Sequence, residues 1–229
     1  MKKHTLLALA LLWTVAVHAD TFDFSNIQYW VGSGSNEAAL VINWGDGPTP
    51  DSLIWGFKWS GGTPTVLDMM QAIDAADSRL SITPHPLYST APSYSVYSIY
   101  YDLTGLGGTP TIGTPGDLGG AEDGHAPFAG DHYREGWYTG FWGELTGDGN
   151  PYNGGAWDSS YPAVQGVGFD TLTNHSWWAL SFSTDLTNFT IPTPGFPTAA
   201  ALAAPEPSSI CLLAVGFFGL AGRRRRRAS

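Results

Sequence analysis

Cysteine is almost absent from this chain of 229 residues. Cys211 is the only one, and it lies in an apolar run close to the C-terminus. A single cysteine excludes an internal disulfide framework and a site built from several thiolates. We expect Cys211 to be a small apolar residue of a helix.

Basic residues are scarce over most of the chain. Between residues 20 and 222 the only Lys and Arg residues are Lys58, Arg79 and Arg134, whereas all twenty Asp and Glu residues lie there, so this part carries a net charge of −17. Nucleic-acid binding needs Lys and Arg to neutralise phosphates, and we therefore expect no nucleic-acid partner. The negative charge favours solubility.

Signatures of catalysis are missing as well. The chain has no Gly-x-Ser-x-Gly elbow, no phosphate-binding glycine loop and no His-x-x-x-His zinc pair, and residues 20–196 contain no cysteine nucleophile. We expect a protein that is not an enzyme. A secreted glycosidase remains an alternative, because two of the many carboxylates could act as acid and base.

The N-terminus has the three parts of a secretory signal peptide. Lys2 and Lys3 precede an apolar run over residues 6–17, and Val17-His18-Ala19 has the small-x-small pattern of a cleavage site. The run is shorter than the roughly 20 residues of a membrane span. We expect residues 1–19 to be a signal peptide and the protein to use the Sec export machinery.

The C-terminus indicates a second targeting device. An Ala/Pro linker over residues 197–207 ends in Pro205-Glu206-Pro207, and an apolar stretch follows over residues 210–221. As a helix this stretch is short for a hydrocarbon core of about 30 Å. Arginines resist translocation and attract anionic headgroups, so we expect residues 208–229 to form a short transmembrane anchor helix with a basic plug. The basic cluster consists of Arg223, Arg224, Arg225, Arg226 and Arg227.

This ordered tail resembles the PEP-CTERM sorting signal of diderm bacteria over about residues 205–229. The resemblance implies that Pro205, Glu206 and Pro207 are the sorting motif and that an exosortase, a membrane cysteine protease, recognises and cuts the tail. It also implies transient membrane anchoring, followed by release or transfer to the cell surface. Sorting systems of this family resemble those found with exopolysaccharide production, which makes polysaccharide a candidate partner.

The rest of the chain has the composition of a mainly β domain, rich in Gly, Pro and aromatic residues. Apolar alternation predicts strands, with glycine-rich turns between several of them. The predicted strands cover residues 27–31, 40–44, 52–59, 94–100, 136–143, 164–170 and 177–183. We expect one exported β-rich domain over residues 20–196, or two sub-units over 20–103 and 104–191, with a β-sandwich-like or β-grasp-like fold.

One segment has helical rather than strand periodicity. Apolar residues at positions 66, 69, 70, 73 and 76 predict an amphipathic helix over about residues 65–77. Thr65 is its expected N-cap, with Asp68 in the first turn. Residues 61–76 also resemble the helix opening of transcobalamin-type β-grasp-like modules. That resemblance implies an alternative function, the binding of a corrinoid-type small molecule.

Two acidic loops have residues suited to a cation. Residues 104–130 are rich in Gly and Pro, and a run of this length without periodicity is uncommon inside a compact domain. The candidate metal ligands are Asp123, His125, Asp131 and, in the loop of residues 147–155, Asp148. No cofactor is expected apart from calcium at these positions. An exposed acidic loop and a plain turn are the competing interpretations.

Aromatic residues are the strongest indication of a ligand. Residues 135–145 alternate so that Trp137 and Trp142 lie on opposite faces of the expected strand, and Trp177-Trp178 divides in the same way. Rings beside carboxylates suit sugar stacking and hydroxyl hydrogen bonding, whereas the competing interpretation is ordinary β packing. The candidate ligand-binding residues are Trp137, Trp142, Trp157 and Trp178. We expect a non-catalytic protein of the cell surface or extracellular matrix.

Overall fold

The computed structural model describes residues 21–85, 89–90, 94–113, 123–136, 139–158, 167 and 170–202. The expected signal peptide, sorting motif and anchor lie outside these residues. Within the described part, no helix is both long and apolar enough to span a bilayer.

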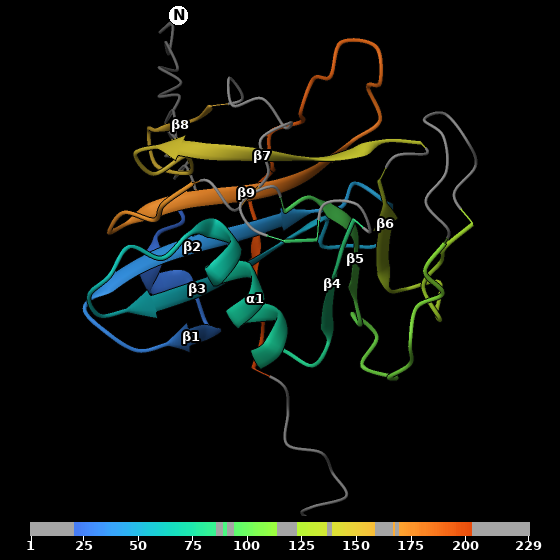
Figure 1. The fold of residues 1–229 in the computed structure, drawn as a ribbon, viewed down its shortest axis with the longest axis horizontal. Coiled ribbons are helices and arrows are strands. Elements are labelled where there is room, and N and C mark those ends of the chain that lie inside the picture. The colour runs from blue at the N-terminus through green and yellow to red at the C-terminus, as the bar shows by residue number, and fades with distance from the viewer. Residues whose placement is uncertain are drawn as a thin grey trace, which may run out of the picture.

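A mixed seven-stranded sheet forms the centre of the fold (Figure 1). Its strand order is β1-β3-β2-β9-β7-β8, and β10 also pairs with β3. The strands are β1 (Trp30–Gly32), β2 (Asn36–Asn43), β3 (Ser52–Trp59), β7 (Phe141–Asp148), β8 (Ala156–Asp158), β9 (Ser176–Ser183) and β10 (Thr198–Ala199). The parallel pairing of β2 with β9 joins the early and late parts of the chain in one sheet.

A smaller antiparallel sheet packs beside the large one. It contains β4 (Leu80–Pro84), β5 (Val96–Tyr101) and β6 (His132–Glu135) in that order. In Figure 1 its strands run across those of the large sheet, and the helix α1 (Val66–Ala76) lies in front of β2 and β3. The prediction of a mainly β body with one helix is therefore confirmed.

The one α-helix of the described residues begins where its sequence predicts. The Thr65 side chain accepts a hydrogen bond from the Asp68 backbone N–H, and the Asp68 side chain accepts one from the Thr65 backbone N–H, which makes a capping box. The buried side of the helix consists of Val66, Leu67, Met69, Met70 and Ile73. Propensity and periodicity agree here, so the local sequence is sufficient to define the element.

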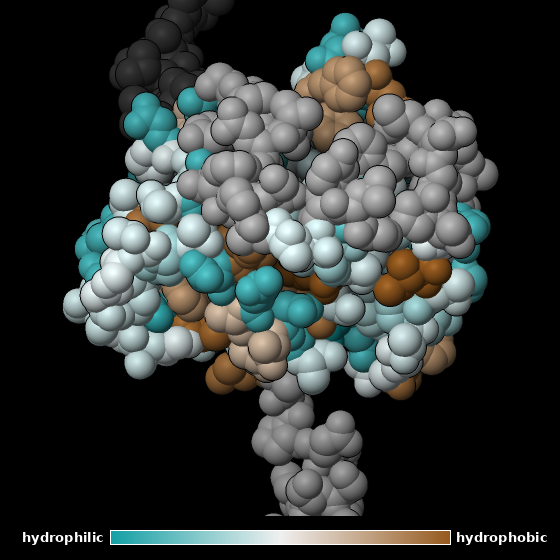
Figure 2. Space-filling model, in the orientation of Figure 1, coloured by the Kyte–Doolittle hydropathy of each residue, from teal (hydrophilic) through white to brown (hydrophobic). Residues whose placement is uncertain are grey.

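Both faces of the large sheet are buried. On β2, Ala38, Leu40 and Ile42 pack with α1 and the small sheet, whereas Ala39 and Val41 point to the opposite face, which we call the outer face. A strand buried on both sides needs a nearly continuous apolar run, as this strand has. On the surface drawn in Figure 2, hydrophobic atoms form only scattered patches.

The outer face is covered by irregular chain rather than by a helix layer. Its apolar cluster combines sheet residues with residues from the N-terminal segment, the β7–β8 hairpin and the segment after β9. The residues that these three segments contribute include Phe22, Phe24, Ile27, Tyr152, Trp157, Leu186 and Ile191. These segments therefore determine what the outer face offers to a ligand.

Several sequence expectations differ from the structure. The strand predicted over residues 136–143 spans a change of sheet, because Gly136 still donates to Tyr97 of β5 while β7 begins only at Phe141. Both Trp177 and Trp178 are buried, on opposite faces, so neither ring points outward. Residues 198–199, expected within the linker, form a strand on the edge of β3.

Candidate functional site

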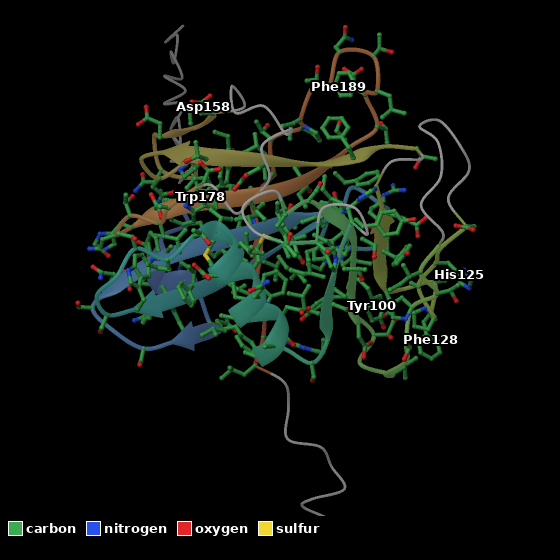
Figure 3. All side chains as sticks on the ribbon, viewed as in Figure 1. Tyr100, His125, Phe128, Asp158, Trp178 and Phe189 are labelled. Carbon is green, nitrogen blue, oxygen red and sulfur yellow. The ribbon has the colours of Figure 1, made fainter. Side chains whose placement is uncertain are left out.

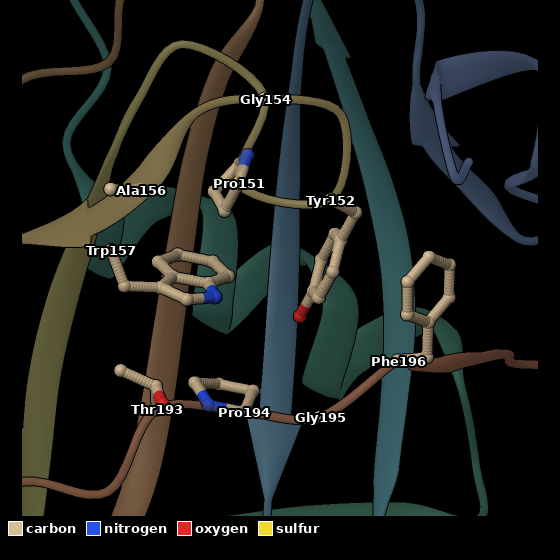
Figure 4. Close-up of a pocket in the computed structure, with 9 residues that line it drawn as sticks. All are labelled: Pro151, Tyr152, Gly154, Ala156, Trp157, Thr193, Pro194, Gly195 and Phe196. Atoms are coloured by element: carbon tan, nitrogen blue, oxygen red, sulfur yellow. The ribbon is translucent and has the colours of Figure 1, made fainter. Parts of the chain in front are cut away.

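A hollow of about 540 Å³, which we call the aromatic groove, lies between the β7–β8 hairpin and the segment of residues 193–196 (Figure 4). Its lining consists of Pro151, Tyr152, Gly154, Ala156, Trp157, Thr193, Pro194, Gly195 and Phe196. No charged side chain is among them. The groove is a shallow, open hollow whose apolar walls and few polar groups are features of ligand sites.

A tight turn between β7 and β8 places Tyr152 in the groove. The Asn150 side-chain oxygen accepts from the Tyr152 N–H at 2.9 Å, and the Asn150 carbonyl accepts from the N–H groups of Asn153 and Gly155. The Asn150 amide also donates to the Phe22 carbonyl at 2.7 Å, which ties the turn to the N-terminal segment. A Cβ on Gly155 would collide with the turn backbone, so this position requires glycine.

Three aromatic rings meet in this groove. The Tyr152 ring contacts Trp157 edge to face, with centroids 5.8 Å apart, and contacts Phe196 at 5.3 Å. On its other side Tyr152 packs against Trp177 at 5.8 Å. Tyr152 is therefore fixed by the core, whereas Phe196 remains 53% exposed and Trp157 is half-buried.

Two polar atoms of these rings face the same space. Figure 4 shows the Tyr152 hydroxyl and the Trp157 indole nitrogen directed toward each other between the rings. Both atoms are buried and have no regular hydrogen-bond partner among the described residues. Burial raises the pKa of the Tyr152 hydroxyl, against a smaller opposing effect of the Trp157 N–H. The hydroxyl therefore stays neutral and can donate a hydrogen bond.

The structure separates the four tryptophans predicted to bind a ligand. Trp142 and Trp178 are 8% and 7% exposed and belong to the core between the large sheet and α1. Trp137 lies outside the described residues. Trp157 is the predicted tryptophan that lines the aromatic groove. Sequence reasoning did not identify its neighbours Tyr152 and Phe196, which lie on the hairpin turn and on the segment after β9.

The candidate metal ligands lie in different places. The Asp131 carboxylate accepts hydrogen bonds from the Tyr100 hydroxyl and the Thr104 N–H, so it fastens a loop. His125 and Asp131 border one shallow hollow of about 290 Å³, with His125 beside β6 in Figure 3. Asp148 belongs to β7 and pairs across the hairpin with Ala156 of β8. Among the described residues, no three His, Cys, Asp or Glu side chains are arranged to hold a metal ion.

A buried acid that we did not predict lies on β7. Glu144 is 8% exposed and borders a cavity of about 20 Å³ together with Trp142, Tyr94 and Leu180. Burial, with a smaller contribution from the charge of Asp170, raises the pKa of Glu144 from 4.5 to about 8. Strand alternation could have identified this acid, because Glu144 lies two residues after the inward-facing Trp142.

The tail matches a known family over a short stretch. Residues 203–226 fit the family model described as the PEP-CTERM protein-sorting motif. The tail is a PEP-CTERM sorting motif. The match includes Pro205, Glu206 and Pro207 and the first four arginines of the basic cluster.

The PEP-CTERM motif indicates export, processing by an exosortase with membrane association, and a cell-surface or extracellular location in Gram-negative bacteria. No curated protein and no solved structure matches the chain. The resemblance of residues 61–76 to transcobalamin-type modules therefore stays a prediction.

Hydrogen bonds hold the residues just before the PEP-CTERM motif against the rest of the protein. The Ala200 N–H donates to the Ile54 carbonyl at 3.0 Å, and the Arg79 guanidinium donates to the Ala201 carbonyl. Arg79 is itself held by Asp77 in an ion pair at 2.9 Å. The sorting signal is thus joined to the large sheet without a long spacer.

Glu144 makes stability depend on pH. Its pKa is raised in the folded protein, so its contribution to stability is complete below pH 4.5 and is lost as the pH rises through about 8. Glu144→Gln should change little at pH 5 but should raise the melting temperature by several degrees at pH 9, since each pH unit between the two pKa values is worth about 1.4 kcal/mol. Thermal melts at both values measure this.

Asp51→Asn is the matched control, because it removes one exposed negative charge from the same strongly acidic protein. Asp51→Asn should shift the melting temperature by the same amount at pH 5 and at pH 9. An equal effect of Glu144→Gln at pH 5 and pH 9 would contradict the raised pKa.

Proposed function

We propose that this chain is a non-catalytic, exported protein of the cell surface or extracellular matrix that contacts polysaccharide through the aromatic groove. Export uses the Sec machinery, and the C-terminal helix anchors the protein transiently before an exosortase removes it. The observation that carries the binding part of the proposal is the groove itself, where Tyr152, Trp157 and Phe196 converge.

The walls of the groove suit a sugar ring. A pyranose has apolar C–H faces and a rim of oxygen atoms, so it packs against rings and prolines while its oxygens seek hydrogen bonds. The groove provides such apolar walls in Pro151, Pro194 and Phe196, and polar atoms in Tyr152 and Trp157. Aromatic residues with a polar tip are well suited to this mixed surface.

A secreted glycosidase is the second candidate, and Glu144 is the observation that favours it. A carboxyl group with a pKa of about 8 stays protonated near neutral pH, as a general acid must. However, Glu144 is 8% exposed and its cavity of about 20 Å³ has room for a water molecule rather than a sugar. We therefore favour the non-catalytic function. No feature of the described residues favours the corrinoid-type binder.

Sorting predicts a shortened mature protein. Intact-mass measurement of the exported protein should show that Arg223–Arg227 are absent and that the new C-terminus lies near residues 205–208. The same gene expressed in a host without exosortase should yield protein that keeps the arginines. Mature protein with all five arginines from a host with active exosortase would contradict the proposal.

Binding predicts that groove rings are needed for retention on polysaccharide. Trp157→Ala and Phe196→Ala should each weaken retention in affinity electrophoresis roughly tenfold, because the loss of one stacking ring costs about 1.4 kcal/mol or more. Phe189→Ala is the matched control, since Phe189 is equally exposed, at 58%, but does not line the groove. Unchanged retention of both groove variants would show that the site lies elsewhere.

A further inference from the structure

The aromatic groove combines neutral lining with charged surroundings. All nine lining residues are uncharged. Asp148 and Asp158 lie on the hairpin that forms one wall, and both are exposed. Across the hairpin Asp148 pairs with Ala156, and Asp158 pairs with Thr146. Asp158, labelled in Figure 3, is the last residue of β8. In the paired strands Asp148 and Asp158 share the face opposite to Trp157, so both carboxylates lie on the hairpin but outside the groove.

The remainder of the surface has the same sign. With three basic and twenty acidic residues between positions 20 and 222, the field around the groove is negative. None of the three basic side chains lines the groove. An anionic ligand would approach against repulsion and would find no cation to pair with.

The interior of the groove nevertheless needs a polar partner. Tyr152 is nine-tenths buried, and the Trp157 N–H faces its hydroxyl oxygen, so the Tyr152 O–H is the donor that lacks an acceptor among the described residues. A buried donor without an acceptor costs free energy, which a ligand can recover by supplying that acceptor. A ligand oxygen would accept the Tyr152 O–H hydrogen bond after a small movement of the rings, because the hydroxyl is covered in the free protein.

We propose that the aromatic groove selects an uncharged sugar unit, so that its ligand is a neutral polysaccharide and not a uronic-acid-rich or sulfated one. This inference rests on the proposed function of the groove. An ether or hydroxyl oxygen of the sugar accepts the Tyr152 hydrogen bond, and the apolar C–H face packs on the Pro194–Phe196 side. The negative charge of the protein around the groove disfavours chains that carry carboxylates or sulfates.

The arrangement of the rings also favours a sugar over a proline-rich peptide, which is another polymer that aromatic grooves bind. Proline-rich peptides lie against parallel aromatic ridges and accept hydrogen bonds from them. Tyr152 and Trp157 are instead nearly perpendicular, at 78°, and Phe196 is tilted by 51° from Tyr152. A short pocket of crossed rings suits one compact ring better than an extended peptide.

Matched polysaccharide pairs provide the test. Soluble glucan, mannan and galactan are each compared with their own carboxymethylated derivative, by affinity electrophoresis of the exported protein at low ionic strength with a chelator present. One neutral chain should be retained at least tenfold more strongly than its carboxymethylated form. The difference should shrink in 0.5 M sodium chloride, where exposed charges are screened.

Three variants assign the effect to the groove. Tyr152→Phe removes only the hydroxyl, and Trp157→Phe replaces the indole with a smaller ring that has no N–H. Each should weaken binding of the neutral chain severalfold, while thermal melts report whether the fold is kept. Asp148→Asn combined with Asp158→Asn should leave binding of the neutral chain unchanged. The double variant should reduce the difference in retention between the neutral chain and its carboxymethylated form.

Each other outcome overturns a different statement. Equal or stronger retention of the carboxymethylated chain overturns the selectivity while the proposed function stands. Retention of none of the polysaccharides overturns the proposed function together with this inference. A further possible result is that a peptide of residues 191–198 displaces a bound neutral chain, while Tyr152→Phe binds that chain as tightly as the unchanged protein does. Together these two results would make the groove a peptide site.

Discussion

The fold depends on the burial of the large sheet from both sides. β2 lies in the middle of that sheet, between β3 and β9, and its two sets of apolar side chains need separate covers. The first cover is regular, because α1 and the small sheet form a layer. The second is assembled from three irregular segments, and irregular chain rarely fills a surface as evenly as a helix layer. The aromatic groove lies where two of these segments meet.

This arrangement links the site to the tail. The segment that forms one wall of the groove continues into β10, which pairs with β3, and then into the sorting motif. The other wall is a hairpin turn fixed by Asn150 to its own backbone and to Phe22. Both walls are therefore tied to the sheet, and the groove is held open by the same contacts that cover the core. A site of this kind requires little ordering when it binds a ligand, which favours affinity.

The sequence predicted the elements that local patterns define. α1 has a capping box and helical periodicity, and β3 and β9 have alternating apolar residues bounded by turn residues, so their bounds were close to those observed. Short strands such as β8 and β10 exist only because a neighbour is present, and no local pattern marks them. Alternation placed Trp177 and Trp178 on opposite faces but could not show that both faces are covered. Trp157 was identified as a candidate, whereas Tyr152 and Phe196 join it only through the fold.

Hydrogen exchange of the exported protein tests most directly whether the C-terminal segment is a wall of the body. If it is, the Ala200 amide, which donates to the Ile54 carbonyl, should exchange slowly. The Gly56 amide, which donates to the Tyr29 carbonyl, and the amides of β2 and β9 should also exchange slowly. Fast exchange over residues 196–202 alongside slow exchange in β2 and β9 would contradict this account, because the segment would then be a linker and the groove would lack its second wall.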